Sequence, residues 1–521
     1  MLAKLFSAAV FGLEVFPVEV EVDVNDGLHS FDIVGLPDPA IKESKQRVSS
    51  AILNSGAKSP LRANKKITIH LAPANVKKFG SYYDLPIALG YLLASNQMPA
   101  FAWDKKLFIG ELNLEGKLRP VPGVLAIALW AQENGFEYLF VPQENALEAA
   151  VAAQKLKVIP LTDLIEAVFM LSGRKEIKSF SYSQPEYGRK LPEIDFSQIH
   201  GQAKIKRALL VAASGGHNIL MIGSPGSGKT LLAKAFWGIL PDLSFGEALE
   251  VTKIYSIANL LPLGKPLMVE RPFRSPHHSS SLAALIGGGT WPQPGEITLA
   301  HRGVLFLDEL PEFRRDALES LRQPLEEGEV CVSRVNGRLK FPSKFILVAA
   351  MNPCPCGYLG HPQKECQCAP GDIIRYRKKI SGPLLDRIDL IVEVPPLSFD
   401  EIHNKSLEST SLELRDKVIQ ARQKQNKRFA ERNKKSSSIL TNSEMNLQDI
   451  EDFCLLDHEA EAILKKAVEK FSLSARSYHR LLKISRTIAD LDDEASASTI
   501  IHRSHLLEAL QYKTDLLEMK Y

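Results

Sequence analysis

The chain has 521 residues, a formal net charge of +3, 45% hydrophobic residues and 24% charged residues. This length is too great for one hydrophobic core and predicts two or three domains of ordinary globular composition. No apolar run approaches the roughly 20 residues that a membrane span needs, and the small net charge means that any nucleic-acid binding must come from local basic patches.

The first residues contain a short apolar stretch like that of a secretion signal. Only about nine apolar residues precede Glu14, and residues 18–24, VEVEVDV, then alternate as a half-buried strand does. We therefore expect a folded N-terminus. Four of the six cysteines are clustered between Cys354 and Cys368, which is no secreted disulfide framework, so a reducing cytoplasm is the expected location.

Residues 1–172 are expected to form one α/β domain, because β-rich runs alternate with apolar helical segments. The predicted strands lie at 66–72, 107–113 and 138–142, and the predicted helices at 84–95 and 123–135. Residues 66–145 resemble the Lon-type peptidase fold (related to that of ribosomal protein S5), which is also appended to the recombination ATPase RadA. The runs FIGELNLEGKLRPVPG and GFEYLFVPQEN carry this resemblance.

The resemblance does not extend to peptidase chemistry. The positions of the Lon serine, alanine and glycine hold Tyr82, Tyr83 and Asp84. Ser81 comes one position early, and no lysine occurs between Pro122 and Gln143. Since a Ser–Lys dyad needs both partners within hydrogen-bond reach, we expect an inactive domain. A scaffold or DNA-channel role remains open, with Lys77 and Lys78 as the available basic residues.

The rest of the chain divides by composition. Residues 173–195 are polar, with Pro, Ser and Gly, as in a linker. Residues 196–400 alternate apolar strands with helices, as a parallel sheet with crossovers does. Residues 411–435 predict a charged helix, and the pattern from 441 onward is helical throughout, so 401–521 is expected to be a helical lid domain.

The strongest motif is GSPGSGKT at residues 223–230, which fits GxxxxGK[ST]. It follows the strand-like HNILMI and precedes the helical LLAKAFWGIL, the context that a phosphate-binding loop requires. Lys229 would reach the β and γ phosphates, and Thr230 would ligate Mg²⁺, so ATP and Mg²⁺ are the expected cofactors. The predicted phosphate-binding residues are Gly223, Ser224, Pro225, Gly226, Ser227, Gly228, Lys229 and Thr230.

Two acidic residues follow a predicted buried strand. The run GVLFLDEL at 303–310 contains Asp308 and Glu309. Ligands bind at the carboxyl ends of parallel strands, so Asp308 is expected in the Mg²⁺ shell and Glu309 as the base that polarises the attacking water. Alone, this pair is equally compatible with a solvated strand end. Its position after a phosphate-binding loop favours the catalytic interpretation.

Two further polar residues are placed like nucleotide sensors. The strand-like FILVAAMN ends in Asn352, which would hold the attacking water; the alternative is a strand-end cap. In SGPLLDRIDLIVEVP, Arg387 directly precedes a predicted strand. A guanidinium suits developing phosphate charge, and at a subunit interface Arg387 would be an arginine finger given in trans. The alternative is a structural salt bridge to Asp386 or Asp389.

Together these motifs resemble an AAA+ ATPase, and longer runs are more specific. DFSQIHGQAKIKRALLVAASGGHNILMIGSPGSGKT, RPFRSPHHSSS, GGGTWPQPGEITLAHRGVLFLDELPEF and RYRKKISGPLLDRIDL identify the chain as similar to the YifB/ComM family of magnesium-chelatase-like AAA+ ATPases. The resemblance implies a homo-hexameric ring that takes ATP at subunit interfaces, with Ile199, Gly201 and Gln202 near the adenine. It also implies that Arg476 is the sensor-2 arginine, with Arg480 as a weaker candidate; an exposed helix face is the alternative.

Residues 328–342, GEVCVSRVNGRLKFP, predict a hairpin with a two-residue turn at Asn336–Gly337. Arg334, Arg338 and Lys340 crowd its tip. A hairpin at this place resembles that of the MCM-like AAA+ clade, where it points into the pore of the ring. Six copies would surround a DNA backbone with cations and contact it without reading sequence. An ordinary solvated hairpin is the alternative.

Trp291 would stack on a base or pack internally, and His277 and His278 have no assigned role.

The clustered cysteines form two C-x-C pairs, Cys354 with Cys356 and Cys366 with Cys368. Four soft ligands in two close pairs suit structural Zn²⁺, and His361 would be able to replace one thiolate. Uncoordinated thiols and an iron–sulfur or redox centre are the alternatives. Cys331 and Cys454 read as ordinary thiols.

Three functions fit these features. The first is a DNA motor driving branch migration of recombination intermediates in natural transformation, as the family resemblance implies, with recombination proteins as possible partners. The second is a magnesium-chelatase-type subunit, against which the long N-terminal domain speaks. The third is a protein-remodelling ATPase, against which an arginine-rich hairpin speaks, since pore loops that grip peptides are usually aromatic. The first is the function we expect.

Overall fold

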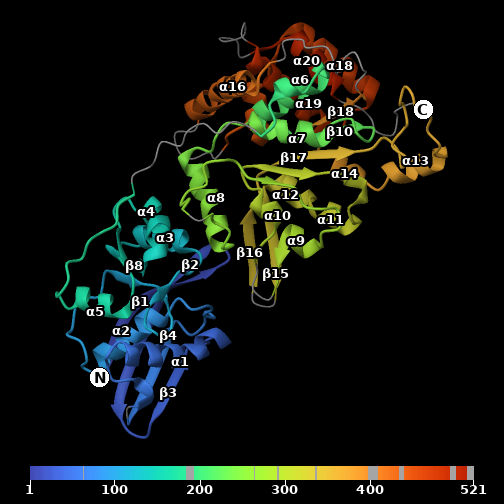
Figure 1. Cartoon of the computed structure of the whole chain (residues 1–521). Coiled ribbons are helices and arrows are strands. Elements are labelled where there is room, and N and C mark those ends of the chain that lie inside the picture. The colour runs from blue at the N-terminus through green and yellow to red at the C-terminus, as the bar shows by residue number, and fades with distance from the viewer. Residues whose placement is uncertain are drawn as a thin grey trace. The chain divides into compact units, whose positions relative to one another are not determined.

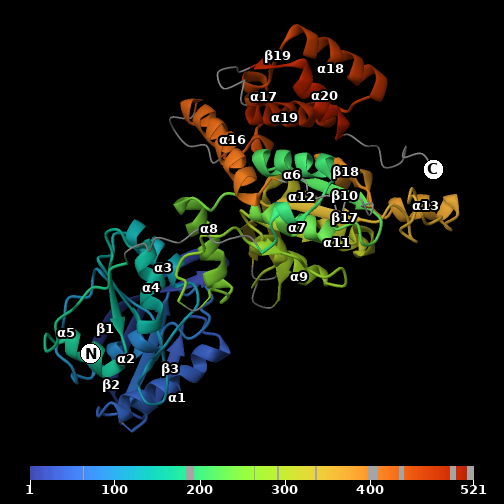
Figure 2. The ribbon, with the colours of Figure 1, turned by 45° about the horizontal axis from the view of Figure 1, so that its top comes forward.

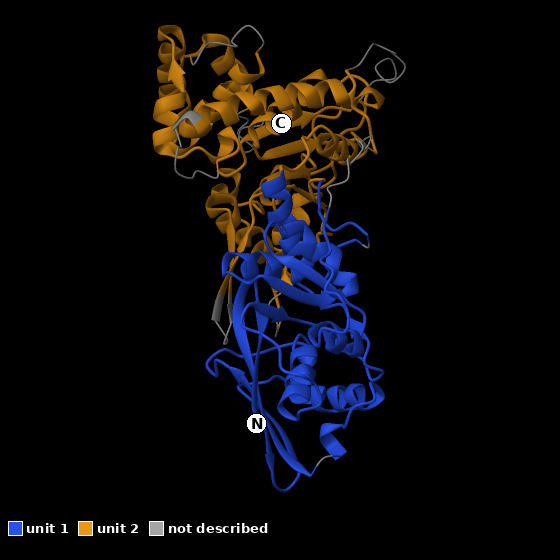
Figure 3. Cartoon of the chain, turned by 90° about the vertical axis from the view of Figure 1, so that its left-hand side faces the viewer, with its two compact units in different colours: residues 1–187, 245–269 blue, residues 188–244, 270–521 orange. Residues whose placement is uncertain are grey.

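The structure is a computed structural model that describes residues 1–62, 64–182, 193–262, 264–289, 293–334, 337–396, 409–432, 439–492 and 500–512 (Figure 1). It comprises two compact units, and each is described by itself (Figure 3). Unit 1 contains residues 1–187 and 245–269, and unit 2 contains residues 188–244 and 270–521. Among the described helices, none combines the length and the apolar character of a membrane span.

Unit 1 is built on a seven-stranded mixed sheet of order β3-β4-β2-β1-β5-β8-β9. Its strands are β1 Leu2–Phe11, β2 Glu14–Asp26, β3 Ser30–Val34, β4 Lys65–Ala72, β5 Lys106–Phe108, β8 Tyr138–Pro142 and β9 Lys157–Leu161. Its helices are α1 Pro39–Asn54, α2 Asp84–Ala94, α3 Val124–Glu133, α4 Ala146–Ala152 and α5 Leu164–Leu171. The alternating 18–24 run lies in β2, where Val18, Val20, Val22 and Val24 are buried, which confirms the half-buried strand.

The predicted strands at 66–72 and 138–142 and the helices at 84–95 and 123–135 are confirmed as β4, β8, α2 and α3. The single strand predicted at 107–113 is wrong, because this run divides. β5 ends at Phe108, and Glu111–Leu112 form the separate strand β6, which pairs with β7 Leu118–Arg119. Between them, Gly110 has φ +153° and its N–H donates to the carbonyl of Tyr82, so the backbone leaves the main sheet there.

Unit 1 also includes α8, Phe245–Ile257, although residues 245–269 lie within the range expected for the ATPase core. The Ser256 hydroxyl bonds to the carboxylate of Glu148 on α4, and the Ser256 carbonyl accepts from the N–H of Gly123, 3.2 Å away. The α8 side chains of Val251, Ile254 and Ile257 are buried. This helix is therefore an integral layer of unit 1.

Unit 2 is built on a five-stranded parallel sheet of order β11-β14-β17-β10-β18, which confirms the expected parallel sheet with crossovers. Its strands are β10 Ile219–Gly223, β11 Phe273–Arg274, β14 Val304–Leu307, β17 Ile346–Met351 and β18 Leu390–Val394. The accompanying helices are α6 Ala203–Gly215, α7 Lys229–Gly238, α9 Leu282–Ile286, α10 Glu296–Leu299, α11 Arg315–Ser320, α12 Arg322–Glu327, α13 Pro370–Arg377 and α14 Gly382–Leu385.

The C-terminal residues are mostly helical, as predicted, and α17–α20 gather into one group (Figure 2). The helices are α16 Ser411–Arg432, α17 Leu447–Phe453, α18 His458–Phe471, α19 Ala475–Leu491 and α20 Arg503–Gln511. The prediction of helix throughout is wrong at two places, because β19 Leu455–Leu456 and β20 Ile500–Ile501 pair in parallel. These two short strands join segments that precede α18 and α20.

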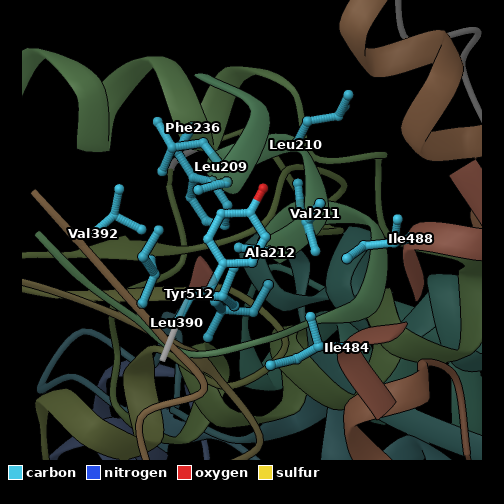
Figure 4. Close-up of a cluster of buried hydrophobic side chains, with 14 of the residues drawn as sticks. Leu209, Leu210, Val211, Ala212, Phe236, Leu390, Val392, Ile484, Ile488 and Tyr512 are labelled. Atoms are coloured by element: carbon cyan, nitrogen blue, oxygen red, sulfur yellow. The ribbon is translucent and has the colours of Figure 1, made fainter. Parts of the chain in front are cut away.

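The helical C-terminal residues share a hydrophobic core with the parallel sheet (Figure 4). Leu209 of α6 and Phe236 of α7 lie in one buried cluster with Leu390 of β18 and with Ile484 and Ile488 of α19. A polar contact reinforces it, since His217 Nε2 lies 2.8 Å from the Thr487 hydroxyl in buried surroundings. The C-terminal helices therefore fold onto the parallel sheet within a single unit.

Candidate active site

The predicted nucleotide residues follow three neighbouring parallel strands. β14, β17 and β10 are adjacent in the sheet, so their carboxyl ends meet at one edge. The loop at 223–230 follows β10, Asp308 and Glu309 follow β14, and Asn352 follows β17. The structure thus brings these groups together at the place where open parallel sheets bind ligands.

Lys229 is the first residue of α7 and its side chain is buried. Its Nζ donates to the carbonyls of Gly223 at 2.7 Å and Ser224 at 3.0 Å, and to Asn352 Oδ1 at 3.2 Å. Burial lowers the pKa of Lys229, and the carboxylates of Asp308 and Glu309 oppose this shift. Phosphate oxygens would be stronger partners for this ammonium group than neutral carbonyls are.

The phosphate-binding loop has the backbone that its glycines predict. Gly226 and Gly228 have φ +80° and +87°, and no atom lies within 4 Å of a Cβ added at either position. The left-handed backbone, and not lack of space, therefore requires glycine there. Among the described residues, the buried hydroxyls of Ser224 and Ser227 have no hydrogen-bond partner. Two such hydroxyls beside a buried lysine fit a bound phosphate chain.

Thr230 and Asp308 form the oxygen pair expected for Mg²⁺. Thr230 Oγ1 donates to Asp308 Oδ2 at 2.8 Å, while Asp308 Oδ1 accepts from the backbone N–H of Glu309 at 2.9 Å. A hydroxyl and a carboxylate in contact at the mouth of a phosphate-binding loop are the hard ligands that Mg²⁺ takes in nucleotide sites. The donor set therefore fits the ion.

Glu309 has a left-handed backbone with φ +53°, and its side chain is 55% exposed. Its Oε2 lies 3.5 Å from Nδ1 of His278, whose ring lies 4.1 Å from that of His277. The histidine pair, which had no assigned role, thus belongs to this site. It follows β11, the strand beside β14 in the parallel sheet, and that adjacency is the signal that the sequence alone does not display.

The segment expected near the adenine also reaches the loop. Gln202 has φ +56°, and its side-chain amide donates to the carbonyls of Ser227 and Pro395, both at 3.2 Å. Gly201 has φ +61°, and Ile199 is buried. Gln202 therefore links this segment to the phosphate-binding loop and to the end of β18.

Arg387 lies at the opposite edge of the sheet. β18 pairs with β10 from Leu390 opposite Ile219 to Val394 opposite Gly223, and Arg387 precedes Leu390. The length of a five-residue strand, about 13 Å, therefore separates Arg387 from its own phosphate-binding loop. Its NH1 donates to the Pro383 carbonyl at 2.6 Å, and its NH2 pairs with Glu326. Its salt bridge is therefore to neither Asp386 nor Asp389.

Arg476, the expected sensor-2 arginine, joins the same ion pair. Its NH2 lies 3.1 Å from Glu326 Oε1, so one carboxylate accepts from both Arg387 and Arg476. Hydrogen bonding to Arg387 lowers the pKa of Glu326. One turn along α19, Arg480 donates to the carbonyls of Ile388 and Asp386, at 2.5 and 2.8 Å. The first turns of α19 are thus fixed to the Arg387 segment.

The predicted hairpin is present as β15 Glu329–Arg334 and β16 Gly337–Pro342. Their register pairs Arg334 with Gly337, so the turn predicted at Asn336–Gly337 is wrong by one residue. Residues 335–336, the side chains of Arg334 and Arg338, and Trp291 lie outside the described residues. Lys340 is exposed and ion-paired with Glu329 at 2.6 Å. The strands of the hairpin are anchored by four buried apolar side chains, those of Val330, Val332, Leu339 and Phe341.

The four clustered cysteines lie in the loop between β17 and α13. Their Sγ atoms are all within 4.8 Å of one another. Cys354 Sγ lies 3.4 Å from that of Cys356 and 3.7 Å from that of Cys366, and Cys356 to Cys366 is 3.6 Å. Zinc–sulfur bonds of about 2.3 Å in a tetrahedron place sulfurs about 3.8 Å apart, so four thiolates fit the ion.

The environment of the thiols differs within the cluster. Burial raises the pKa of Cys354 to about 12. Burial opposes the shift at Cys356, yet hydrogen bonds from the backbone at Tyr358 and Gln367 hold its pKa at about 6. The group of ligand atoms within 4.8 Å of one another does not include His361, whose Nδ1 accepts from the backbone N–H groups of Gln363 and Lys364. Cys331 and Cys454 lie elsewhere.

The Lon-like positions of unit 1 form a structural network. Ser81 bonds to Glu111, and the buried Asp84 pairs with Arg47 at 2.9 Å and accepts from the N–H of Leu112 at 3.2 Å. Lys78 is fully buried and donates to the Pro73 carbonyl, so the expectation that it is available to DNA is wrong. Lys77 is exposed, with its Nζ 5.0 Å from the Phe79 ring centroid.

Replacing Arg47 with methionine is expected to reduce the stability of unit 1 by about 3 kcal/mol at pH 7, because it leaves a buried carboxylate with only the Ser44 hydroxyl and one backbone N–H as donors. Burial raises the pKa of Asp84, and losing Arg47 raises it further. A proton then binds the folded state more tightly, so the deficit shrinks at acidic pH. Hydrogen exchange of α2 amides measures both effects. Lys45→Met, which removes an exposed pair with Asp32, is the control and should cost below about 0.5 kcal/mol.

Comparison with known protein families covers most of the chain. A model described as magnesium chelatase, subunit ChlI, matches residues 195–402. A second, subunit ChlI of Mg-chelatase, matches residues 20–145, and a third, magnesium chelatase, subunit ChlI C-terminal, matches residues 408–513.

Individual proteins match over nearly the full length. Competence protein ComM of Haemophilus influenzae is 42% identical over 516 residues, which cover 98% of this chain and 97% of that protein. Protein YifB of Escherichia coli, which is uncharacterized, is 42% identical over 514 residues, with the same coverage of 98% and 97%. The magnesium-chelatase subunit ChlI homolog of Methanocaldococcus jannaschii is 24% identical over 272 residues, or 44% of this chain and 68% of that protein.

Proposed function

The chain belongs to the YifB/ComM family of magnesium-chelatase-like AAA+ ATPases, and from this premise we propose that it is a hexameric motor that moves DNA. The family makes it an ATPase that uses ATP and Mg²⁺. The observation that carries the proposal is the place of the β15–β16 hairpin. It lies in the chain between β14, which leads to Glu309, and β17, which leads to Asn352. Changes at the nucleotide therefore act on both ends of the hairpin.

The arrangement of arginines supports a ring. A complete hydrolysis site needs a cation on the transferred phosphate, and Arg387 lies about a strand's length from its own Lys229. A neighbouring copy that presents its Arg387 edge to this subunit's phosphate-binding loop would complete the site. Repetition of such a head-to-tail contact closes into a ring. The number six comes from the family resemblance.

Each residue has a distinct task in hydrolysis. Lys229 and the loop amides would bind the phosphates, and Thr230 with Asp308 would hold Mg²⁺, which neutralises charge on the β and γ phosphates. Glu309, within reach of solvent, would take the proton of the attacking water. Asn352 already faces the Lys229 ammonium, so it is placed to report the state of the γ phosphate.

The substrate we propose is branched or single-stranded DNA, bound without sequence preference and moved during homologous recombination. Arg334, Arg338 and Lys340 of the hairpin carry the charge for phosphate contacts. A relative at 42% identity is named a competence protein, which supports a role in natural transformation, with recombination proteins as partners. We place the activity in the cytoplasm, where thiols such as those of the cysteine cluster stay reduced.

Two variants test the motor. We expect Lys229→Ala to abolish ATP hydrolysis and strand movement on branched DNA. Arg334→Ala/Arg338→Ala should keep the basal rate of ATP hydrolysis within about twofold of wild type. Its rate of strand movement should fall at least about tenfold, because the salt-dependent contacts with DNA phosphates are lost. Lys465→Ala/Lys466→Ala removes equal charge from the exposed side of α18 and serves as the control. Wild-type strand movement by the hairpin variant would exclude the hairpin as the DNA-binding element. Stimulation by unfolded protein instead of DNA would indicate protein remodelling.

We also propose that Cys354, Cys356, Cys366 and Cys368 hold a structural Zn²⁺. Sulfur separations of 3.4 to 3.7 Å match the edges of a zinc–thiolate tetrahedron. The site is closed by four protein ligands, as structural zinc sites are, so the ion would stabilise the loop and take no part in hydrolysis.

A further inference from the structure

We propose that the four-cysteine cluster braces the phosphate-binding loop, so that zinc occupancy sets the affinity for nucleotide. This inference rests on the zinc site proposed above and goes beyond it, because it couples a site outside the phosphate-binding loop to the binding of phosphates. The coupling element is the turn at 354–357, which carries cluster ligands and touches the phosphate-binding loop.

The contact between the two loops is direct. Gly357 is buried and has φ +82°. A methyl group added there would lie 2.5 Å from Cδ and 2.7 Å from Cγ of Pro225, and 3.8 Å from Cγ of Asn352. The Gly357 backbone therefore packs against the third residue of the phosphate-binding loop and next to the amide that faces Lys229. A side chain at 357 would push Pro225 away, because proline is rigid.

The cluster fixes this turn from both sides. The N–H of Gly357 donates to the Cys354 carbonyl at 3.0 Å. The N–H of Cys356 donates to Cys368 Sγ and the N–H of Leu359 donates to Cys354 Sγ, each at 3.4 Å. Both ligands of the first pair thus lie within three residues of Gly357, and sulfur accepts hydrogen bonds from the turn itself. A metal that holds the sulfurs also holds Gly357 against Pro225.

The second pair connects the brace to the rest of unit 2. Cys368 lies two residues before α13, whose Arg377 donates through its guanidinium to the Pro353 carbonyl at 3.4 Å. The start of the cysteine loop, at Pro353, is therefore linked to α13, the helix that follows the loop. A polar loop of this length has little apolar surface to bury, so local crosslinks must hold it.

Removing the metal would leave thiols whose mutual contacts are weak, and the turn would sample other conformations. Nucleotide then binds only the fraction of molecules in which Gly357 still supports Pro225, so its apparent dissociation constant rises by the inverse of that fraction. The rate of hydrolysis in a loaded site depends on Glu309 and the arginine finger, so it changes little. A change in affinity with a preserved turnover rate is the signature of this brace.

The decisive experiment compares two glycine variants of the full chain. Gly357→Ala should keep zinc, measured by mass spectrometry of the metal, and bind a fluorescent ADP at least about tenfold more weakly. Gly360→Ala is the matched control, since Gly360 has φ +76° but no atom lies within 4 Å of its added Cβ. It has the same backbone penalty without the contact and should bind zinc and ADP within about twofold of the wild-type chain.

A second arm removes the metal. Extraction of zinc by a chelator, or Cys366→Ser/Cys368→Ser, should weaken ADP binding, and readdition of zinc to the extracted wild-type chain should restore it. Zinc that binds but leaves ADP affinity unchanged on removal, or equal ADP affinities of the two glycine variants, would overturn the brace alone. If the purified chain neither contains nor takes up zinc, both the zinc site and the proposed effect of zinc on ADP affinity would be overturned. Neither result bears on DNA movement.

Discussion

Arg387→Ala is expected to lower the turnover number of ATP hydrolysis by about 10³-fold while ATP binding falls less than about threefold. The guanidinium lies at the amino end of β18, whereas Lys229, Asp308 and Asn352 lie at the carboxyl ends of the same sheet. At this separation the guanidinium would not reach ATP bound in its own subunit. Its loss would remove stabilisation of transition-state charge in the neighbouring subunit.

Mixing variants tests this assignment sharply. Arg387→Ala has an intact phosphate-binding loop, and Lys229→Ala has an intact finger, so an interface between the two chains is complete. We expect each variant to be inactive alone and the mixture to regain hydrolysis. Arg375→Ala, which removes an exposed arginine from α13, is the control and should retain activity. An inactive mixture that still forms rings would show that Arg387 does not act in trans.

Glu309→Gln is expected to lower the turnover number by about 10² to 10⁴-fold with ATP affinity retained, because an amide of equal size cannot accept the proton of the attacking water. The Thr230–Asp308 contact does not involve the Glu309 side chain, so the magnesium ligands stay in place. Steady-state phosphate release and binding of a fluorescent ATP analogue separate the two effects.

Glu312→Gln provides the matched control, since it lies three residues further on and pairs with Lys379. It should hydrolyse ATP like the wild-type chain. If Glu309→Gln retained turnover, or if it lost ATP binding to the same extent as turnover, Glu309 would be a structural residue and the general base would have to be sought elsewhere at the site.

The residues whose positions could be predicted from the sequence are those whose signals are local. The phosphate-binding loop, Asp308, Glu309 and Asn352 each end a short apolar run, and parallel pairing alone then brings them to one edge. The apolar faces of the helices and of β2 are likewise readable from periodicity. The error at the hairpin is also local: Asn-Gly is a strong turn signal, but the register that packs Val332 and Leu339 inward includes Gly337 in the strand.

Other features depend on partners far away in the chain. Ser256 of α8 forms a hydrogen bond with Glu148, 108 residues earlier, and no local sequence pattern around Ser256 predicts that partner. The burial of Lys78 cannot be predicted from a Lys-Lys pair, because it comes from the folded surroundings in which its ammonium group donates to the Pro73 carbonyl. His278 becomes significant only once β11 is seen beside β14.

The shared carboxylate of Glu326 has a consequence for how readily the finger moves. In a buried ion pair of two residues, departure of one partner leaves the other charge without a counterion, which opposes the departure. Here Glu326 is half exposed and Arg476 also lies 3.1 Å from it, so the carboxylate would remain neutralised if Arg387 moved toward a neighbour's phosphate. The resting contact can therefore hold the guanidinium in position between turnovers without trapping it. Since Arg480 joins α19 to the same segment, such a movement of Arg387 would also be transmitted to α19.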